Sequence, residues 1–194
     1  MKNKSLWIIL GIVAVVLIWG VTTYNGLVSK DEKVASAWAN VETVYQRRAD
    51  LIPNLVNTVK GYAAHESKTL ADVTEARAKS TAISIDPSTA TPAQMEAWMK
   101  AQGEVSSALG RLIAISENYP ELKANQNFLE LQKQLEGTEN RISTERRKYN
   151  EEVRGYNAKI RRFPTNLIAG MFGFEKRVMF EAQEGAEVAP VVAF

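Results

Sequence analysis

The chain has 194 residues, and its 24 Lys and Arg residues against 22 Asp and Glu residues give a formal net charge of +2. Basic and acidic residues are interleaved, so the sequence lacks the basic stretch typical of nucleic-acid binding, and we expect no nucleic-acid partner. The chain contains no cysteine, which excludes disulfides, thiol catalysis and cysteine-ligated metals.

An uncharged segment from Ser5 to Ser29 lies near the start of the chain, and its core, Leu6–Val21, is almost entirely apolar. A helix needs about 20 such residues to cross the hydrocarbon of a bilayer. We therefore predict a membrane anchor at residues 1–29, with lipid contact through residues 6–24. A cleaved signal peptide is the alternative, but the residues after Val21 lack the small-residue pattern of a cleavage site.

Lys and Arg residues flank the apolar segment on both sides in almost equal number. Only the amino terminus itself adds positive charge to one side, and positive charge favours the cytoplasmic side of a membrane. We therefore expect the amino terminus in the cytoplasm and the bulk of the chain outside.

The sequence after the anchor predicts three long helices. In the first, near 30–83, the residues of one face recur at spacings of three and four, the pattern of a helix-bundle or coiled-coil seam. That seam consists of Val34, Trp38, Val41, Tyr45, Arg48, Ile52, Leu55, Val59 and Tyr62. A capping box at Thr91, Pro92 and Gln94 begins the second helix, near 92–118. The third, near 125–162, ends before Phe163-Pro164, because the residue preceding a proline disfavours helical geometry.

These elements predict an all-α fold, with an N-terminal transmembrane helix followed by an antiparallel bundle of long helices and a short C-terminal helix. The residues after the anchor suffice for one domain with its own core. We divide the chain into four segments: the anchor at 1–29, the bundle at 30–163, an apolar C-terminal helix at 164–180 and a tail at 181–194.

Large apolar side chains crowd the segment after Pro164, namely Leu167, Ile168, Met171, Phe172 and Phe174. The segment either caps the bundle or forms an exposed patch for a membrane surface, another subunit or a partner. Three helices that run up, down and up would leave it far from the membrane, where we expect it to mediate self-association. A bend at Pro53 or a long turn at Tyr119-Pro120 would instead return it to the bilayer as an interfacial helix.

Arg48 is the charged residue in the seam of the first helix, and a charge in a seam must find partners. The partners that we expect are Glu117 and Glu139. Asn150 and Asn157 of the third helix lie seven residues apart and therefore share a face. We expect a structural polar network made of Arg48, Asp50, Glu117, Glu139, Arg141, Asn150 and Asn157. Such a network either fixes the register of the helices or forms a binding groove.

His65-Glu66 is the one place that suggests a zinc hydrolase. The metallopeptidase helix needs a second histidine four residues after the first, and Thr69 occupies that position. The chain also lacks the glycine-rich loops that bind nucleotide phosphates and the elbow that presents a catalytic serine. We therefore expect no catalytic residue, no metal and no cofactor, and a hydrolase built on His65 and Glu66 is the less favoured alternative.

Four motifs of this sequence resemble those of the LemA family. They are R-R-x-D-L-I-P-N-L-V at 47–56, V-K-G-Y-A-x-H-E at 59–66, E-x-Y-P-x-L at 117–122 and E-N-R-I-x-x-x-R-x-x-Y-N-x-x-V-x-x-Y-N at 139–157. They occur in the order of the family, and the resemblance spans essentially the whole chain, with the tail as the variable part. It implies a bacterial inner-membrane protein with one N-terminal span and a helical bundle outside the cytoplasm.

The resemblance implies little about biochemical activity. Members of the family often accompany membrane-bound zinc peptidases of the HtpX kind, which suggests a partner of that kind. Together with the lack of a catalytic pattern, this predicts a non-enzymatic scaffold or adaptor of the cell envelope that forms a homo-oligomer. An envelope sensor or ligand-binding bundle, moving about Pro53, is the alternative.

Overall fold

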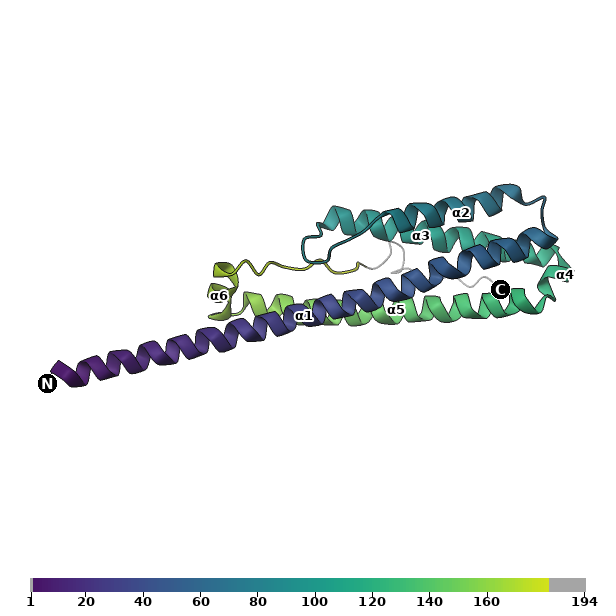
Figure 1. Cartoon of the computed structure of the whole chain (residues 1–194). Helices are drawn as coiled ribbons and strands as arrows, with labels where there is room; N and C mark the ends of the chain where they lie inside the picture. Colours follow the sequence, from purple (N-terminus) through teal and green to yellow (C-terminus); the bar gives the residue numbers. More distant parts are fainter. Residues whose placement is uncertain (1, 182–194) are drawn as a thin grey trace, which may run out of the picture.

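The computed structural model describes residues 2–181, and this part of the chain is helical without any β-strand. The long helices are α1 (Lys2–Tyr62), α2 (Ser67–Ala82), α3 (Pro92–Ile115) and α5 (Gln126–Arg161). The short elements are the 3-10 turn η1 (Ser116–Asn118), α4 (Pro120–Lys123) and α6 (Thr165–Met171). The all-α fold predicted from the sequence, with a long apolar N-terminal helix ahead of a bundle, is confirmed (Figure 1).

The amino-terminal part of α1 is long and apolar enough to cross a membrane. The rest of the described chain leaves this part uncovered, so large apolar side chains such as Trp7, Ile12 and Leu17 are exposed. Further along the same helix, Leu27 and Val34 are fully buried. One helix therefore changes from a surface suited to lipid to the core of a bundle without a break.

The first helix of the bundle ends earlier than we expected. We predicted one helix over 30–83, but α1 ends at Tyr62 and α2 begins at Ser67. Between them, the amide of Glu66 donates a hydrogen bond to the carbonyl of Ala63 at 3.0 Å. No proline marks this turn. It is stabilised by the burial of Ala63 and by the packing of α2 against both α1 and α3, and such tertiary packing outweighs local helix propensity.

This extra turn reverses the direction of every later helix. From the amino-terminal end, α1 runs outward, α2 runs back, α3 runs outward again and α5 returns (Figure 1). The end of α5 and α6 therefore lie beside the part of α1 that follows the apolar span. Our expectation that the apolar block after Pro164 lies far from the membrane end was wrong.

Pro53 lies inside α1 and has no amide hydrogen, so the carbonyl of Ala49 loses its helical partner. Arg77 of α2 donates Nε to that carbonyl at 2.7 Å. The second helix thus satisfies the gap that the proline opens in the first, which also fixes how the two helices are aligned.

Two hydrophobic cores follow one another along the bundle. The membrane-proximal core includes Leu27, Val34, Trp38, Val41, Tyr45, Trp98, Tyr149, Tyr156 and Phe180. The distal core includes Ile52, Leu55, Val59, Val73, Val105, Leu112, Leu122, Phe128 and Leu135. Every predicted seam residue of α1 from Val34 to Val59 is buried. Arg48 is buried between the two cores.

The short C-terminal helix is present as α6, but it ends well before residue 180. Gly173 follows it with φ at +73°, a backbone conformation that residues with a Cβ rarely adopt. Residues 174–181 then carry no helix and run back along the bundle (Figure 1). We call residues 174–180 the strap. The tail, apart from Glu181, lies outside the described residues.

Candidate functional site

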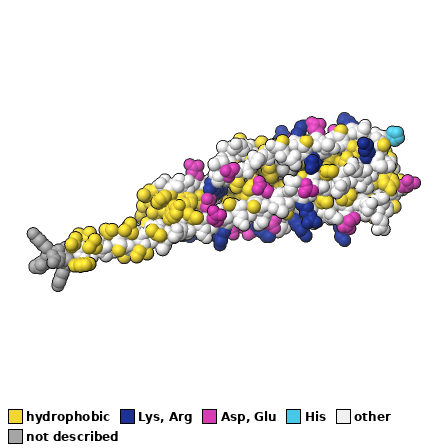
Figure 2. All heavy atoms as spheres, viewed as in Figure 1, with side chains coloured by type: hydrophobic (Ala, Val, Ile, Leu, Met, Phe, Trp, Pro, Cys, Tyr) yellow, Lys and Arg dark blue, Asp and Glu magenta, His cyan; other side chains and the backbone are white. Residues whose placement is uncertain are grey.

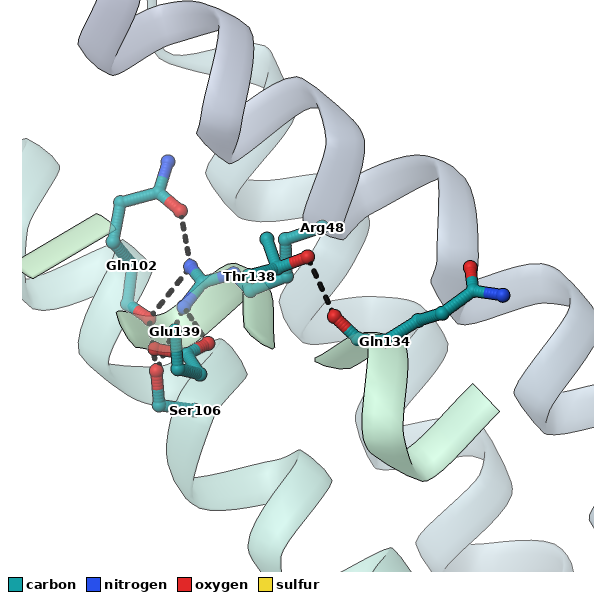
Figure 3. Close-up of polar contacts among 6 residues, drawn as sticks. All are labelled: Arg48, Gln102, Ser106, Gln134, Thr138 and Glu139. Atoms are coloured by element: carbon teal, nitrogen blue, oxygen red, sulfur yellow. Dashed lines mark hydrogen bonds and ion pairs between the residues drawn. The ribbon is translucent and has the colours of Figure 1, made fainter. Parts of the chain in front are cut away.

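Arg48 is the centre of a polar layer between the two cores (Figure 3). Its side chain is only 2% exposed and donates to Glu139 Oε1 at 2.8 Å. It also donates to Ser106 Oγ at 2.8 Å and to the carbonyl and Oε1 of Gln102 at 3.2 and 2.6 Å. The guanidinium carbon lies 5.0 Å from the centre of the Tyr45 ring. The layer therefore joins α1 to α3 and α5 through one buried cation.

Only some of the residues grouped with Arg48 from the sequence lie near it. Glu139 does, whereas Glu117 pairs with Lys123 at the far end of the bundle. Asp50 accepts a hydrogen bond from Gln46 on the exposed side of α1. Arg141 is exposed on α5. Asn150 and Asn157 lie at a second site, nearer the apolar span of α1.

The two asparagines of α5 bind the backbone of the strap. The amide group of Asn157 donates to the carbonyl of Arg177 and accepts from its N–H, both at 2.9 Å. Asn150 does the same with Phe180, at 2.9 and 2.8 Å. Tyr149 donates its hydroxyl to the Val178 carbonyl at 3.0 Å. Side chains seven residues apart thus substitute for the partners that an extended backbone would find in a sheet.

The strap also places two large side chains in the bundle. The Phe180 ring is buried among aromatic rings, with its centre 5.7 Å from that of Trp38 and 5.2 Å from that of Tyr149. Arg177 donates to Asp31 Oδ1 of α1 at 2.7 Å and lies over the Tyr156 ring. These contacts close the membrane-proximal core with an element that is not a helix.

Burial in this core changes the titration of its tyrosines. It raises the pKa of Tyr149 to about 12, with Arg177 opposing the rise. Burial also raises the pKa of Tyr156 above its ordinary value, again against Arg177. Both phenols therefore keep their protons to a higher pH than an exposed tyrosine does.

An open cavity of about 580 Å³ lies beside the polar layer. Charged side chains of both signs line it, among them Lys100, Arg146, Glu96 and Glu139. It offers hydrogen bonds and charge to a small polar ligand. Because all four Arg48 bonds go to protein atoms, Arg48 would contribute to such a ligand mainly through its charge.

His65 and Glu66 lie in the turn between α1 and α2 at the far end of the bundle. His65 is exposed (Figure 2), and Glu66 accepts a hydrogen bond from the Tyr119 hydroxyl at 3.1 Å. Within residues 2–181, no group of three His, Cys, Asp or Glu side chains is placed to hold a metal ion. Among the described residues, His65 therefore has no neighbouring side chains that could complete a metal site with it.

The apolar block divides into two faces. Ile168 and Phe174 are half-buried and pack on the membrane-proximal core. Leu167, Met171 and Phe172 are exposed, as is Phe163 just before them. The rings of Phe172 and Phe174 lie 4.8 and 5.7 Å from the Tyr24 ring of α1. The block therefore meets α1 where the apolar span ends.

Sequence reasoning missed the strap and the residues that bind it. It identified Asn150 and Asn157 by their shared face, but it gave Arg177 no role and placed Phe180 only at the end of the predicted C-terminal helix. Their only signal was the spacing of the two asparagines, which marks a polar stripe on a helix and leaves its partner open. Asp31 gave no signal, and Trp38, whose ring contacts Phe180, was identified only as a seam residue.

The chain is similar to several known proteins. A family model described as the LemA family matches residues 37–194. Magnetosome protein MamQ of Magnetospirillum gryphiswaldense is 28% identical over 188 residues, which cover 87% of this chain and 68% of that protein. Protein LemA of Metamycoplasma hominis is 26% identical over 160 residues, covering 82% and 69% of the two chains. The similarity thus includes the bundle, the polar layer and the strap.

Proposed function

From the premise that this chain belongs to the LemA family, whose model matches residues 37–194, we propose that it is a membrane-anchored, non-enzymatic scaffold or adaptor of the bacterial cell envelope. Its bundle projects from the bilayer and presents a fixed surface to other proteins. The anchor and the bundle act as one rigid body.

The observation that carries this proposal is the continuity of α1. This helix has 61 residues from Lys2 to Tyr62, a length of about 90 Å at 1.5 Å per residue. It contains both the apolar span and the seam that both cores pack against. Because no linker separates the two parts, the orientation of the bundle follows that of the span. Such a frame suits a protein that holds partners at a set distance from a membrane.

The proposed location is the inner membrane, with the amino terminus in the cytoplasm and the bundle outside. The chain has no cysteine, so a single Leu129→Cys substitution in α5 gives one reactive thiol on the bundle. A membrane-impermeant maleimide should label this variant in intact spheroplasts. Labelling that requires lysis would place the bundle in the cytoplasm instead.

The partners that we propose are a second copy of the chain and a membrane zinc peptidase of the HtpX kind. Crosslinking of the full-length protein in native membranes, followed by mass spectrometry, tests both together. We expect crosslinks from exposed lysines of the bundle, such as Lys68 and Lys123, to the same membrane protein in repeated experiments. Bait consisting of residues 1–29 alone controls for chance encounters in the bilayer. If the full-length protein yields no more crosslinks than this control, the result contradicts the proposal that the chain is a scaffold.

The non-enzymatic part of the proposal has its own test. His65→Ala should leave any cellular phenotype of the chain unchanged, since His65 is exposed and has no metal-ligating neighbours. Loss of the phenotype in a variant that folds and inserts normally would instead support hydrolysis at His65 and Glu66.

The cavity beside Arg48 favours one second candidate, a ligand-binding sensor of the envelope. Its mixed charges suit a small zwitterion or a peptide terminus rather than an apolar molecule. A ligand that binds there should raise the melting temperature of the protein, and Lys100→Ala should weaken the effect. An unchanged melting temperature across a library of small polar metabolites would leave the scaffold as the only candidate.

A further inference from the structure

We propose that the exposed face around α6 is a second membrane contact, which lies in the headgroup region of the bilayer that α1 crosses. We call this face the α6 surface, and it consists of Phe163, Leu167, Met171 and Phe172. Its occupant is the lipid surface itself, with anionic headgroups held by the basic residues next to it.

The first support is the position of the α6 surface along α1. Trp7 and Tyr24 lie 17 residues apart in one helix, or about 26 Å. Aromatic residues at this separation match the two interfaces of a bilayer whose hydrocarbon is about 30 Å thick. Tyr24 then marks the outer interface, and the Phe172 ring lies 4.8 Å from its ring. The α6 surface is therefore at the depth of the lipid headgroups.

The second support is the division of α6 into two faces. Thr165 and Ala169 are buried against the rest of the bundle. Leu167 and Met171 lie four residues apart on the other face of α6 and are 55% and 76% exposed, and Phe163, which precedes the helix, is 79% exposed. Clusters of exposed large apolar side chains mark interaction sites.

The third support is charge. Among residues 161–176, the acidic residue is Glu175, whereas Arg161, Arg162 and Lys176 are basic and exposed. An apolar face flanked by exposed basic side chains is the pattern of segments that lie in an anionic membrane interface.

A second copy of the chain is the competing occupant. In the view of Figure 2, no charged side chain separates the apolar surface of the span from the apolar surface at the near end of the bundle, where α6 lies. Lipid that covers the exposed side chains of α1 therefore reaches α6 as well. A protein partner would have to displace that lipid from a short face beside a span.

Spin labels can measure the depth of the α6 surface directly. Since the chain has no cysteine, Met171→Cys can be labelled alone in the full-length protein. Leu129→Cys is the matched control, because Leu129 is also apolar and exposed but lies at the far end of the bundle. Val13→Cys reports the span. Each variant goes into nanodiscs that contain phosphatidylcholine with phosphatidylglycerol, and power saturation compares collisions with oxygen and with a water-soluble nickel chelate.

We expect position 171 to meet oxygen several-fold more, and the nickel chelate several-fold less, than position 129, with a depth between those of positions 129 and 13. A label at 171 as open to nickel as that at 129 would overturn the proposal. So would a label shielded from both reagents, because that result means cover by protein. Nanodiscs without phosphatidylglycerol test the charge: the label should move toward water, and an unchanged depth would refute the role of anionic headgroups.

Discussion

The two halves of the bundle use the same helices in different ways. In the distal half, α1, α2, α3 and α5 cover one another, and the core is mainly aliphatic. In the membrane-proximal half the core is rich in aromatic rings, and the strap fills part of it with Phe180. Arg48 lies between these halves. One continuous seam on α1 is therefore covered by helices alone over part of its length and by helices together with a non-helical segment over the rest.

The largest expected effect comes from emptying the aromatic core. Phe180→Ala should lower the free energy of unfolding by about 3–5 kcal/mol, because the ring is 5% exposed and leaves a cavity. It should also release the strap, seen as fast hydrogen exchange of residues 175–180.

Leu112→Ala is the matched change in the distal core, where the side chain is fully buried. It should cost about 2–5 kcal/mol while the strap keeps its slow exchange under native conditions. Equal loss of strap protection in both variants would show that the two halves are not separate in the way described.

The next largest loss of stability should follow from removing the cation of the polar layer. Arg48→Met removes one buried cation and its four hydrogen bonds. We expect a loss of about 3 kcal/mol, at the low end for breaking a buried pair, because Glu139 is 43% exposed and regains water.

Lys79→Met provides the control for this change, since its pair with Glu75 is exposed on both sides. This change should leave the free energy of unfolding nearly unchanged, because exposed ion pairs contribute little to stability. Thermal and urea unfolding would measure both variants, and an Arg48 variant as stable as the Lys79 variant would contradict a structural role for the layer.

Removing the hydrogen bonds between α5 side chains and the backbone of the strap should have a smaller effect on stability. Asn157→Ala removes two hydrogen bonds to Arg177, worth about 1–2 kcal/mol together. Asn140→Ala on the same helix is the control, because Asn140 is exposed. Hydrogen exchange should speed up at Arg177 and its neighbours in the first variant alone. Identical exchange rates in the two variants would contradict a role for Asn157 in holding the strap.

The last predicted effect is confined to alkaline pH, where it changes the pH dependence of stability. Burial raises the pKa of Tyr149 from the ordinary 10.0 to about 12, so the unfolded chain loses this proton first as the pH rises. The stability that depends on the neutral phenol is complete below pH 10 and is lost between pH 10 and about 12. Tyr149→Phe should therefore show a shallower loss of stability over that range in urea titrations. A parallel pH profile in the variant would contradict the shift.

Helical periodicity predicted much of the fold. The seam residues from Val34 to Val59 are buried as expected, and the capping box forms at Thr91 and Gln94. The turn after Tyr62 was missed because Ala63 to Glu66 contains no proline or glycine, and only the packing of α2 selects it. Because this one turn was missed, the predicted directions of the later helices were reversed, and the apolar block was predicted at the wrong end of the bundle.

Contacts in the candidate site could be predicted from the sequence only where both residues lie on helices with a recognisable apolar periodicity. Arg48 and Glu139 both lie on helices, so their meeting could be expected from the seam. The strap has no periodicity, and its contacts with Trp38 and Asp31 join residues that are far apart in the chain. Contacts of that kind depend on the packed structure and leave no local trace in the sequence.

Return of the C-terminal segment to the end of α1 that carries the apolar span is the feature on which the second membrane contact depends. A double variant, Tyr24→Cys with Phe172→Cys, tests it when the full-length protein in native membranes is treated with a short bismaleimide. The structure predicts a rapid crosslink within one chain, because the two rings lie 4.8 Å apart, and none in a control pair of Tyr24→Cys with Leu129→Cys. A crosslink that forms only between chains, or no crosslink in a normally folded variant, would contradict it.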